Sequence, residues 1–218
     1  MAIIIRVTFT LLLLLIVSLV LAYFVWYGPK IKPLTAVPSV HSTLAISKGK
    51  TVYTRLKMKA DSLHSFASKN KFNTSTFFLI DMTIESGRNR FFVFDVKQDS
   101  VILQGLVTHG RCNQSWLNGR KFGNELGCGC TSLGKYKIGY QYSGRFGLAY
   151  KLYGLDTTNN NAFKRHVVLH AHECVPEQDV FPAPICQSDG CPTVSTGFLS
   201  KLLPIIEQSP KPILLLIF

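Results

Sequence analysis

The longest apolar stretch of the chain lies at its N-terminus, between Val7 and Tyr27. A helix rises about 1.5 Å per residue, so this stretch is long enough to cross a hydrocarbon layer of roughly 30 Å. Aromatic residues gather at its far end, and Gly28-Pro29 then ends the helical pattern. We therefore expect residues 1–29 to form an N-terminal transmembrane anchor or signal segment.

The side of the membrane on which the rest of the chain lies is not decided by this stretch. Val20-Leu21-Ala22 matches the small-residue pattern of a signal-peptide cleavage site, but the apolar character continues past Ala22 and favours an uncleaved anchor. Arg6 precedes the span and four lysines follow it, which alone would keep the next domain in the cytoplasm. Large C-terminal domains translocate largely regardless of such charges.

A spacer and then a folded domain are expected after the anchor. Residues 30–49 contain Pro33 and Pro38 among small and polar residues, without helical or strand periodicity. The domain is predicted over residues 50–218. Its first element is an amphipathic helix from Thr51 to Lys69, in which apolar residues recur at helical spacing. These residues are Val52, Leu56, Met58, Leu63 and Phe66.

Short runs of β-branched and aromatic residues dominate the rest of the domain and predict strands. The expected strands are 76–82, 90–96, 101–108, 135–140, 147–152, 165–171 and 211–218. Polar turns of hairpin length separate the first three, which predicts an antiparallel meander. A helix is expected over 195–208, with Pro204 kinking it or ending it early. The fold class is mainly β (β-rich α+β) with two or three helices.

The charge of the chain favours an anionic partner. Its 24 Lys and Arg against 12 Asp and Glu give a formal net charge of +12. A phospholipid surface, an acidic wall polymer and nucleic acid all fit this charge. The basic residues are scattered, without a basic run or an aromatic RNA-binding signature, so we do not expect nucleic acid as a partner.

Candidate chemistry is concentrated near the segment from Gln187 to Thr193. Cys191 follows Gly190 and precedes a proline, which places a thiol on a sharp turn with exposed backbone N–H groups. On the preceding strand, His170 and His172 are two positions apart and share a face. A thiol beside an imidazole is the arrangement of a cysteine nucleophile.

Plainer interpretations of these residues stay open at this point. A lone thiol such as Cys191 is more often buried and inert. Ser188 is either a hydroxyl that supports the turn or an ordinary turn residue. A polar, Gly-rich loop over residues 109–129 is too long for a simple connection, and is expected to be functional or cross-linked.

Several motifs resemble one enzyme family. Ser188-Asp189-Gly190-Cys191, preceded by Val167-Val168-Leu169-His170, is similar to the His…Ser-x-Gly-Cys signature of the L,D-transpeptidases, and specifically of the murein L,D-transpeptidase catalytic-domain-like branch. The segment Thr131–Tyr136 resembles that family's Thr-x-x-Gly-x-Tyr motif. Residues 147–165 resemble the stretch that leads into its histidine strand, and His109-Gly110 resembles an early His-Gly of the branch.

The resemblance implies a fold and a reaction. The fold is an L,D-transpeptidase-like catalytic β-sandwich. In the implied reaction, Cys191 attacks the amide between a meso-diaminopimelate-type residue and the terminal D-alanine of a peptidoglycan stem. His170 is the general base, and the backbone N–H groups of Gly190 and Cys191 are oxyanion donors. The implied chemistry needs no metal and no cofactor.

The chain departs from the family near the expected substrate site. Thr193 stands two residues after the cysteine, where better-known branches carry an arginine that could help bind a substrate carboxylate. Arg165 is the alternative source of that charge, unless it forms an ion pair at a strand edge. His172, Glu173 and Cys174 alter the wall after the histidine. The candidate substrate-binding residues are Arg165, His109, Thr193 and His172.

The other five cysteines bear on the compartment. In an oxidising compartment, Cys174 is expected to pair with Cys186, and Cys112 with Cys128 or Cys130. The implied reaction places the domain in the cell envelope, outside the cytoplasm, with peptidoglycan stems as partners and the membrane as anchor.

Three alternatives to a transpeptidase remain at this stage. The first is an L,D-carboxypeptidase, which differs only in using water in place of an amine. The second is a zinc site built from His170, His172 and some of three cysteines, because such sets bind Zn²⁺ tetrahedrally. These cysteines are Cys174, Cys186 and Cys191. The third is a non-catalytic cell-wall module in which Cys191 is structural.

Overall fold

The structure of the chain is a computed structural model that describes residues 13–23 and 40–218. The chain divides into two units, Met1–Gly49 and Lys50–Phe218. In the first unit, residues 13–23 form a helix with exposed side chains. No helix among the described residues is long and apolar enough to span a membrane. Residues 7–12 and 24–27 of the anchor predicted from Val7 to Tyr27 lie outside the described residues, and the anchor stays a prediction, as does the spacer role of 30–49.

The helix α2 (Val40–Lys69) begins 11 residues before the predicted start at Thr51. No proline follows Pro38 in this stretch, so no residue there sterically blocks helical continuation. From Lys50 onward its buried side chains recur at helical spacing and face the sheet. They are Leu56, Ala60, Leu63 and Ala67. Met58, predicted on the apolar face, points to solvent with 66% of its surface exposed.

Eight strands follow, and the positions of seven agree with the predicted runs except at the ends. They are β1 (Thr76–Ile80), β2 (Phe91–Asp95), β3 (Ser100–Gly105), β4 (Gly134–Gly144), β5 (Gly147–Gly154), β6 (Val168–Ala171), β7 (Thr193–Val194) and β8 (Leu214–Ile217). The predicted meander is confirmed, because β1 pairs antiparallel with β2, and β2 with β3. The two-residue strand β7 was not predicted. Strand β6 begins three residues late, after His166, whose φ of 57° interrupts an extended backbone.

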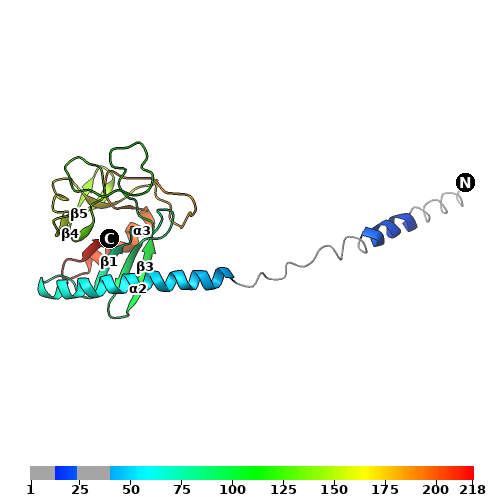
Figure 1. Cartoon of the computed structure of the whole chain (residues 1–218), viewed down its shortest axis with the longest axis horizontal. Coiled ribbons are helices and arrows are strands. Elements are labelled where there is room, and N and C mark those ends of the chain that lie inside the picture. The colour runs from blue at the N-terminus through cyan, green and yellow to red at the C-terminus, as the bar shows by residue number, and fades with distance from the viewer. Residues whose placement is uncertain (1–12, 24–39) are drawn as a thin grey trace, which may run out of the picture. The chain divides into compact units, whose positions relative to one another are not determined.

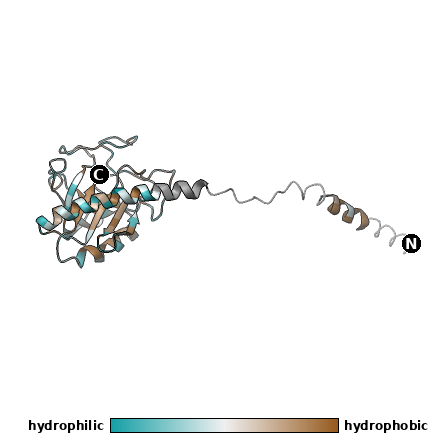
Figure 2. Ribbon diagram, turned by 60° about the horizontal axis from the view of Figure 1, so that its bottom comes forward, coloured by the Kyte–Doolittle hydropathy of each residue, from teal (hydrophilic) through white to brown (hydrophobic). Residues whose placement is uncertain are grey.

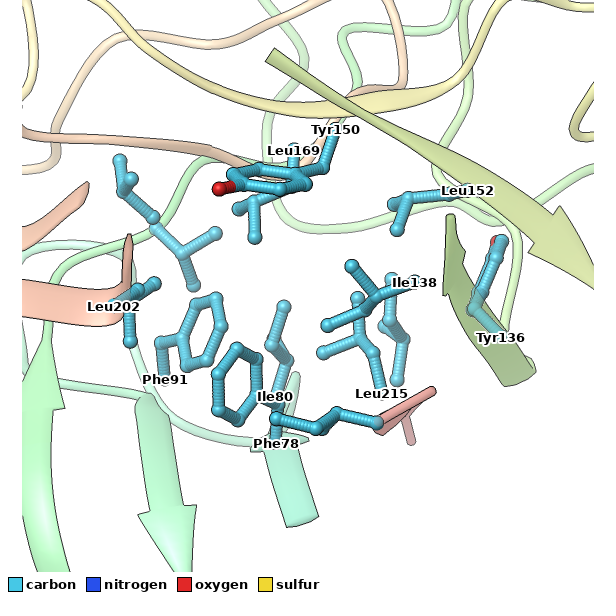
Figure 3. Close-up of a cluster of buried hydrophobic side chains, with 14 of the residues drawn as sticks. Phe78, Ile80, Phe91, Tyr136, Ile138, Tyr150, Leu152, Leu169, Leu202 and Leu215 are labelled. Carbon is cyan, nitrogen blue, oxygen red and sulfur yellow. The ribbon is translucent and has the colours of Figure 1, made fainter. Parts of the chain in front are cut away.

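All eight strands form one hydrogen-bonded sheet in the order β3-β2-β1-β8-β4-β5-β6-β7. This corrects the prediction of a β-sandwich, which would hold two separate sheets. The C-terminal strand β8 makes the difference, since it pairs parallel with β1 on one side and antiparallel with β4 on the other. The sheet bends around its main core, in which side chains of β1 and β2 face those of β5 and β6 (Figure 3).

Side chains alternate between two cores along the central strands. On β1, Phe78 and Ile80 enter the main core, while Phe77 and Leu79 face α2 on the other side. Strands β1, β2 and β8 are therefore buried on both faces. In Figure 2, α2 crosses these apolar strands, and Figure 1 shows the same helix beside β1 and β3.

The second helix of this unit, α3 (Thr196–Glu207), closes the main core. Ser195 caps its N-terminus by accepting a hydrogen bond from the N–H of Phe198 at 3.2 Å. The prediction that Pro204 kinks or ends this helix early is wrong as to its length, because the helix runs on to Glu207. Proline removes one intrahelical hydrogen bond, but Phe198, Leu199 and Leu202 hold the preceding turns against the core.

Candidate active site

Cys191 stands on a turn that only glycine can complete. The φ of Gly190 is 108°, a conformation that strains any residue with a side chain. A Cβ at Gly190 would also lie 2.5 Å from the carbonyl oxygen of Cys130. The turn therefore packs directly on the backbone of the 109–130 region while it presents Cys191 beside the start of β6.

Ser188 holds this turn closed. Its Oγ donates to the carbonyl oxygen of Cys191 at 2.7 Å and accepts a hydrogen bond from the N–H of Gly190 at 3.2 Å. Its backbone bonds to the start of the long loop, through His109 and Arg111. Of the two readings of Ser188, the geometry favours the hydroxyl that supports the turn. Because the N–H of Gly190 is engaged by Ser188, it is not available to an oxyanion in this conformation.

Thr108 fixes the other side of the same turn and was missed at the sequence level. Its Oγ1 donates to the carbonyl oxygen of Cys191 and accepts from the N–H of Thr193, both at 3.1 Å. Its N–H donates to the carbonyl oxygen of Thr193 at 2.9 Å. The one available signal was its position next to the His109-Gly110 motif.

The thiol of Cys191 is held by backbone groups of the β6 region. Its Sγ accepts from the N–H of Val168 at 3.5 Å and lies 3.8 Å from the carbonyl oxygen of His166. Burial raises the pKa of this thiol above its ordinary value of 9.0, and the Arg165 guanidinium and the N–H of Val168 act in the opposite direction. The resting thiol is therefore protonated at neutral pH.

His170 lies on β6, and each of its two ring nitrogens makes a hydrogen bond. Its Nδ1 is 3.0 Å from the carbonyl oxygen of Ala171, which requires a proton on Nδ1. Its Nε2 is then the basic nitrogen, and it accepts from the hydroxyl of Thr193 at 3.0 Å. Burial lowers the pKa of this imidazole below 6.5, so His170 is neutral at pH 7. No hydrogen bond joins His170 to the Cys191 thiol in the described structure, and Thr193 occupies the nitrogen that would make it.

His172 shares the face of His170, as the strand alternation predicts. The ring of Phe146 stacks on His170 at 5.1 Å and meets His172 edge-on at 5.4 Å. The Nδ1 of His172 accepts from the N–H of Cys174 at 3.1 Å, which closes the turn after β6. His172 thus lies beside His170, and the Phe146 ring contacts both imidazoles.

Arg165 faces the site but its guanidinium bonds to the protein itself. It donates to the carbonyl oxygens of Gly123 and Cys130 and to the hydroxyl of Ser132. No ion pair of Arg165 occurs among the described residues. It ties the segment before β6 to the long loop, and a substrate carboxylate would have to displace these bonds to reach it.

His109 lies in a different environment from His170. Its Nδ1 accepts from the guanidinium of Arg90 at 3.0 Å, and its Nε2 donates to the carbonyl oxygen of Gly119 at 3.1 Å. Burial and the nearby Arg90 lower its pKa to about 4. Arg90 is itself fully buried, forms no ion pair with any described residue, and donates twice to the carbonyl oxygen of Val107. His109 borders a hollow of about 350 Å³ that does not include Cys191.

Two disulfides brace the loops around the turn. Cys174 pairs with Cys186, as predicted, and Cys112 pairs with Cys130, which selects one of the two expected partners. Cys128 and Cys191 are the free thiols of the described chain. The Cys174–Cys186 disulfide removes two of the cysteine ligands that the zinc alternative could use. No cluster of three or more metal-binding side chains occurs among the described residues.

Comparison with known proteins identifies one family. The profile of the L,D-transpeptidase catalytic domain matches residues 47–213. No curated protein matches the chain. Among solved structures, the helical cell shape determining protein Pgp2 of Campylobacter jejuni is 11% identical with a TM-score of 0.44, and the match covers 66% of this chain and 46% of that one.

Two further solved structures have the same kind of similarity. An L,D-transpeptidase of Xylanimonas cellulosilytica is 16% identical with a TM-score of 0.38, and the match covers 71% of this chain and 68% of that one. An L,D-transpeptidase of Mycobacterium smegmatis is 11% identical with a TM-score of 0.40, with coverages of 66% and 58%. The chain thus spans less than half of the Pgp2 structure that it matches.

Proposed function

The chain belongs to the L,D-transpeptidase catalytic-domain family, and on this premise we propose that it is a peptidoglycan L,D-transpeptidase with Cys191 as its nucleophile. The Cys191 sulfur forms a thioester with the carbonyl carbon of a meso-diaminopimelate-type residue. The bond to the terminal D-alanine breaks, and D-alanine leaves with a proton on its amine. An amine of a second stem, or water, then cleaves the thioester and restores the thiol.

One observation carries this proposal. Of the two free thiols in the described chain, Cys191 is the one on the Gly190 turn, and its sulfur lies against the strand that bears His170. The Ser188 and Thr108 hydroxyls both bind the carbonyl oxygen of this cysteine. Two hydroxyls on one carbonyl hold the backbone of this cysteine in a single position, as a nucleophile requires. This arrangement therefore supports a positioned nucleophile over the non-catalytic wall module.

His170 is the general base of the proposal, and Thr193 controls its access to the thiol. The acceptor nitrogen of His170 faces the Thr193 hydroxyl, which also lies 3.5 Å from the carbonyl oxygen of Cys191. When the hydroxyl turns to that carbonyl, Nε2 is released to take the thiol proton. Catalytic hydrogen bonds often form only in the substrate complex. The N–H of Cys191, which has no partner among the described residues, serves as the oxyanion donor.

The two disulfides support a location outside the cytosol, because disulfides persist in oxidising compartments. A peptidoglycan enzyme acts in the cell envelope, which agrees with that compartment. Membrane anchoring by residues 1–29 remains part of the proposal, to be tested by fractionation of cells that express the full chain or the chain lacking these residues.

The test of the nucleophile is intact-protein mass spectrometry of the full chain after incubation with a carbapenem. We expect a covalent adduct on the parent protein and on Cys128→Ala, and none on Cys191→Ala. Cys128 is the matched control, because it is the other free thiol of the described chain.

An adduct that persists in Cys191→Ala, or that is lost only in Cys128→Ala, would assign the reactive thiol elsewhere. If the folded parent protein with reduced thiols forms no adduct, this result would contradict the proposal that the chain is an enzyme. Release of D-alanine from tetrapeptide stems, measured on the same three proteins, then separates true turnover from simple acylation.

A further inference from the structure

The outward face of β4 and β5 carries a row of partly exposed cations and aromatic rings. Lys137 and Tyr153 are cross-strand partners, with the Lys137 Nζ 4.4 Å from the ring centroid. The Tyr153 ring stacks on Phe163 at 5.1 Å and 11°. The Lys151 Nζ lies 4.2 Å from the Tyr142 ring and 6.0 Å from Phe163. We call these five residues the aromatic-lysine face.

The sequence of the hairpin places this face outward. Tyr150 and Leu152 point into the main core, so the alternate residues Lys151 and Tyr153 point away from it. Gly139 completes the arrangement on β4, because a Cβ there would lie 2.4 Å from the Tyr153 ring. Glycine thus lets this ring lie flat across the strand. Phe163 keeps 46% of its surface exposed, so the face remains open to solvent.

The aromatic-lysine face continues to the candidate nucleophile. Lys151 is the cross-strand partner of Val168, and directly paired residues share a face of a sheet. The N–H of Val168 in turn contacts the Cys191 sulfur. Lys151 is also among the charges that act on the Cys191 thiol, where it opposes the effect of burial on the pKa. A polymer that lies along the face can therefore place one of its branches at Cys191.

The cations of this face are available to a ligand. Neither Lys137 nor Lys151 forms an ion pair in the part of the chain that the structure describes, whereas the neighbouring Lys135 is paired with Asp156. Arg165, the other cation near Cys191, donates to protein carbonyls. A carboxylate that approaches the thiol along β5 can therefore pair with Lys151.

The chemistry of the face fits an anionic glycopeptide. The partly exposed rings offer flat apolar surfaces of the kind that stack on the apolar faces of sugars, and apolar patches that stay open to solvent mark interaction sites. Unpaired lysines attract carboxylates, in line with the net charge of +12. Nucleic acid also combines charge with flat rings, but the continuity with Cys191 favours the polymer that carries the acyl donor.

We propose that the aromatic-lysine face binds the peptidoglycan strand that bears the donor stem, with Phe163 and Tyr153 against sugar rings and Lys151 against a stem carboxylate. This inference rests on the proposed function, since it names the surface that delivers the substrate to Cys191. It assigns the carboxylate-binding charge to Lys151 in place of the predicted Arg165.

The test is co-sedimentation of the full chain with purified insoluble peptidoglycan, in the Cys191→Ala background so that no chemistry intervenes. We expect Phe163→Ala to weaken binding about fivefold, from the loss of one stacked ring. The double variant Lys137→Gln/Lys151→Gln should weaken it roughly fivefold to tenfold, as expected for two exposed ion pairs. Peptidoglycan whose carboxylates have been amidated should bind the parent protein as weakly as untreated peptidoglycan binds the double variant.

The chain offers matched controls outside the face. Phe181, 43% exposed, lies under the guanidinium of Arg88 in a separate cation–aromatic pair, and Lys97 is an exposed lysine of the turn after β2. Phe181→Ala and Lys97→Gln should bind peptidoglycan as the parent does. Circular dichroism melting checks that each variant is folded. If Phe163→Ala does not fold, the double variant Lys137→Gln/Lys151→Gln still tests the face.

Parent-like binding by both the ring and the lysine variants would overturn the inference. Displacement of the bound protein by a single-stranded DNA oligonucleotide, but not by soluble glycan–peptide fragments, would overturn it in favour of nucleic acid. These outcomes are separate from a failure of the proposed function, which shows in the carbapenem experiment through Cys191 alone.

Discussion

Two buried histidines contact the segment from Gln187 to Thr193, and they differ in what their nitrogens hold. His109 receives a hydrogen bond from the Arg90 guanidinium and donates to a backbone carbonyl, so both nitrogens bind fixed groups. His170 donates to a backbone carbonyl, but its basic nitrogen accepts from the Thr193 hydroxyl, which can rotate. Burial keeps both imidazoles neutral. The difference lies in the partner: a buried guanidinium makes one histidine structural, and an exchangeable hydroxyl leaves the other able to take a proton.

Replacing each histidine with alanine tests this comparison with the largest expected effect. We expect His170→Ala to slow carbapenem acylation about 10³-fold, the usual value of a general base, with its fold kept. His109→Ala should leave the acylation rate of the folded protein close to the parent's but lower the melting temperature. Acylation followed by mass spectrometry and melting followed by circular dichroism check both. Equal losses of acylation rate in the two folded variants would contradict the distinction.

Removing the Arg90 guanidinium tests whether this group makes His109 a structural residue. Arg90→Met leaves the carbonyl oxygen of Val107 and the His109 ring without their buried donor, so we expect a loss of about 3 kcal/mol in the free energy of unfolding. Arg88→Met, at a half-exposed arginine two positions away, should change it by less than about 0.5 kcal/mol. Urea unfolding measures both, and similar small values would show that Arg90 does not hold the region.

Thr193→Val tests the exchangeable partner of His170. Valine keeps the shape of threonine but removes the hydroxyl that holds the His170 ring in place through Nε2, so the base loses its fixed orientation and we expect acylation to slow about tenfold. Thr193→Ser retains the hydroxyl and should restore most of the rate. Parent-like acylation by Thr193→Val would remove threonine from the mechanism.

The smallest expected effect is on the pH dependence of acylation. A base must be unprotonated to accept the thiol proton, and burial lowers the pKa of His170 below its ordinary 6.5. An unshifted histidine would lose half of its basic form at pH 6.5, so the rate between pH 7.5 and 6.5 should fall by less than about twofold. A mass-spectrometric rate profile checks this. An acid limb centred at or above pH 6.5 would contradict a buried, neutral His170.

Local sequence patterns were sufficient to predict most of the helices and strands and to select Cys191 and His170 as candidate catalytic residues. Runs of aromatic and β-branched residues predicted seven of the eight strands, because strand propensity and side-chain alternation are local. The Gly190-Cys191 turn could be located in the same way, since its positive φ depends on one glycine. The pairing of Cys174 with Cys186 followed from a short separation of 12 residues.

The tertiary structure decided everything that depends on partners distant in the chain. Thr108 reaches the Cys191 carbonyl across 83 positions, and β8 joins the two halves of the sheet by pairing beside β1. Arg165, expected at the substrate, donates instead to carbonyls of a loop that packs on it, and no pattern along the chain carries that information. The sequence alone determined which residues could do chemistry, because residue type and turn geometry are local properties. Long-range packing determined which of their nitrogens, oxygens and charges were left free to do it.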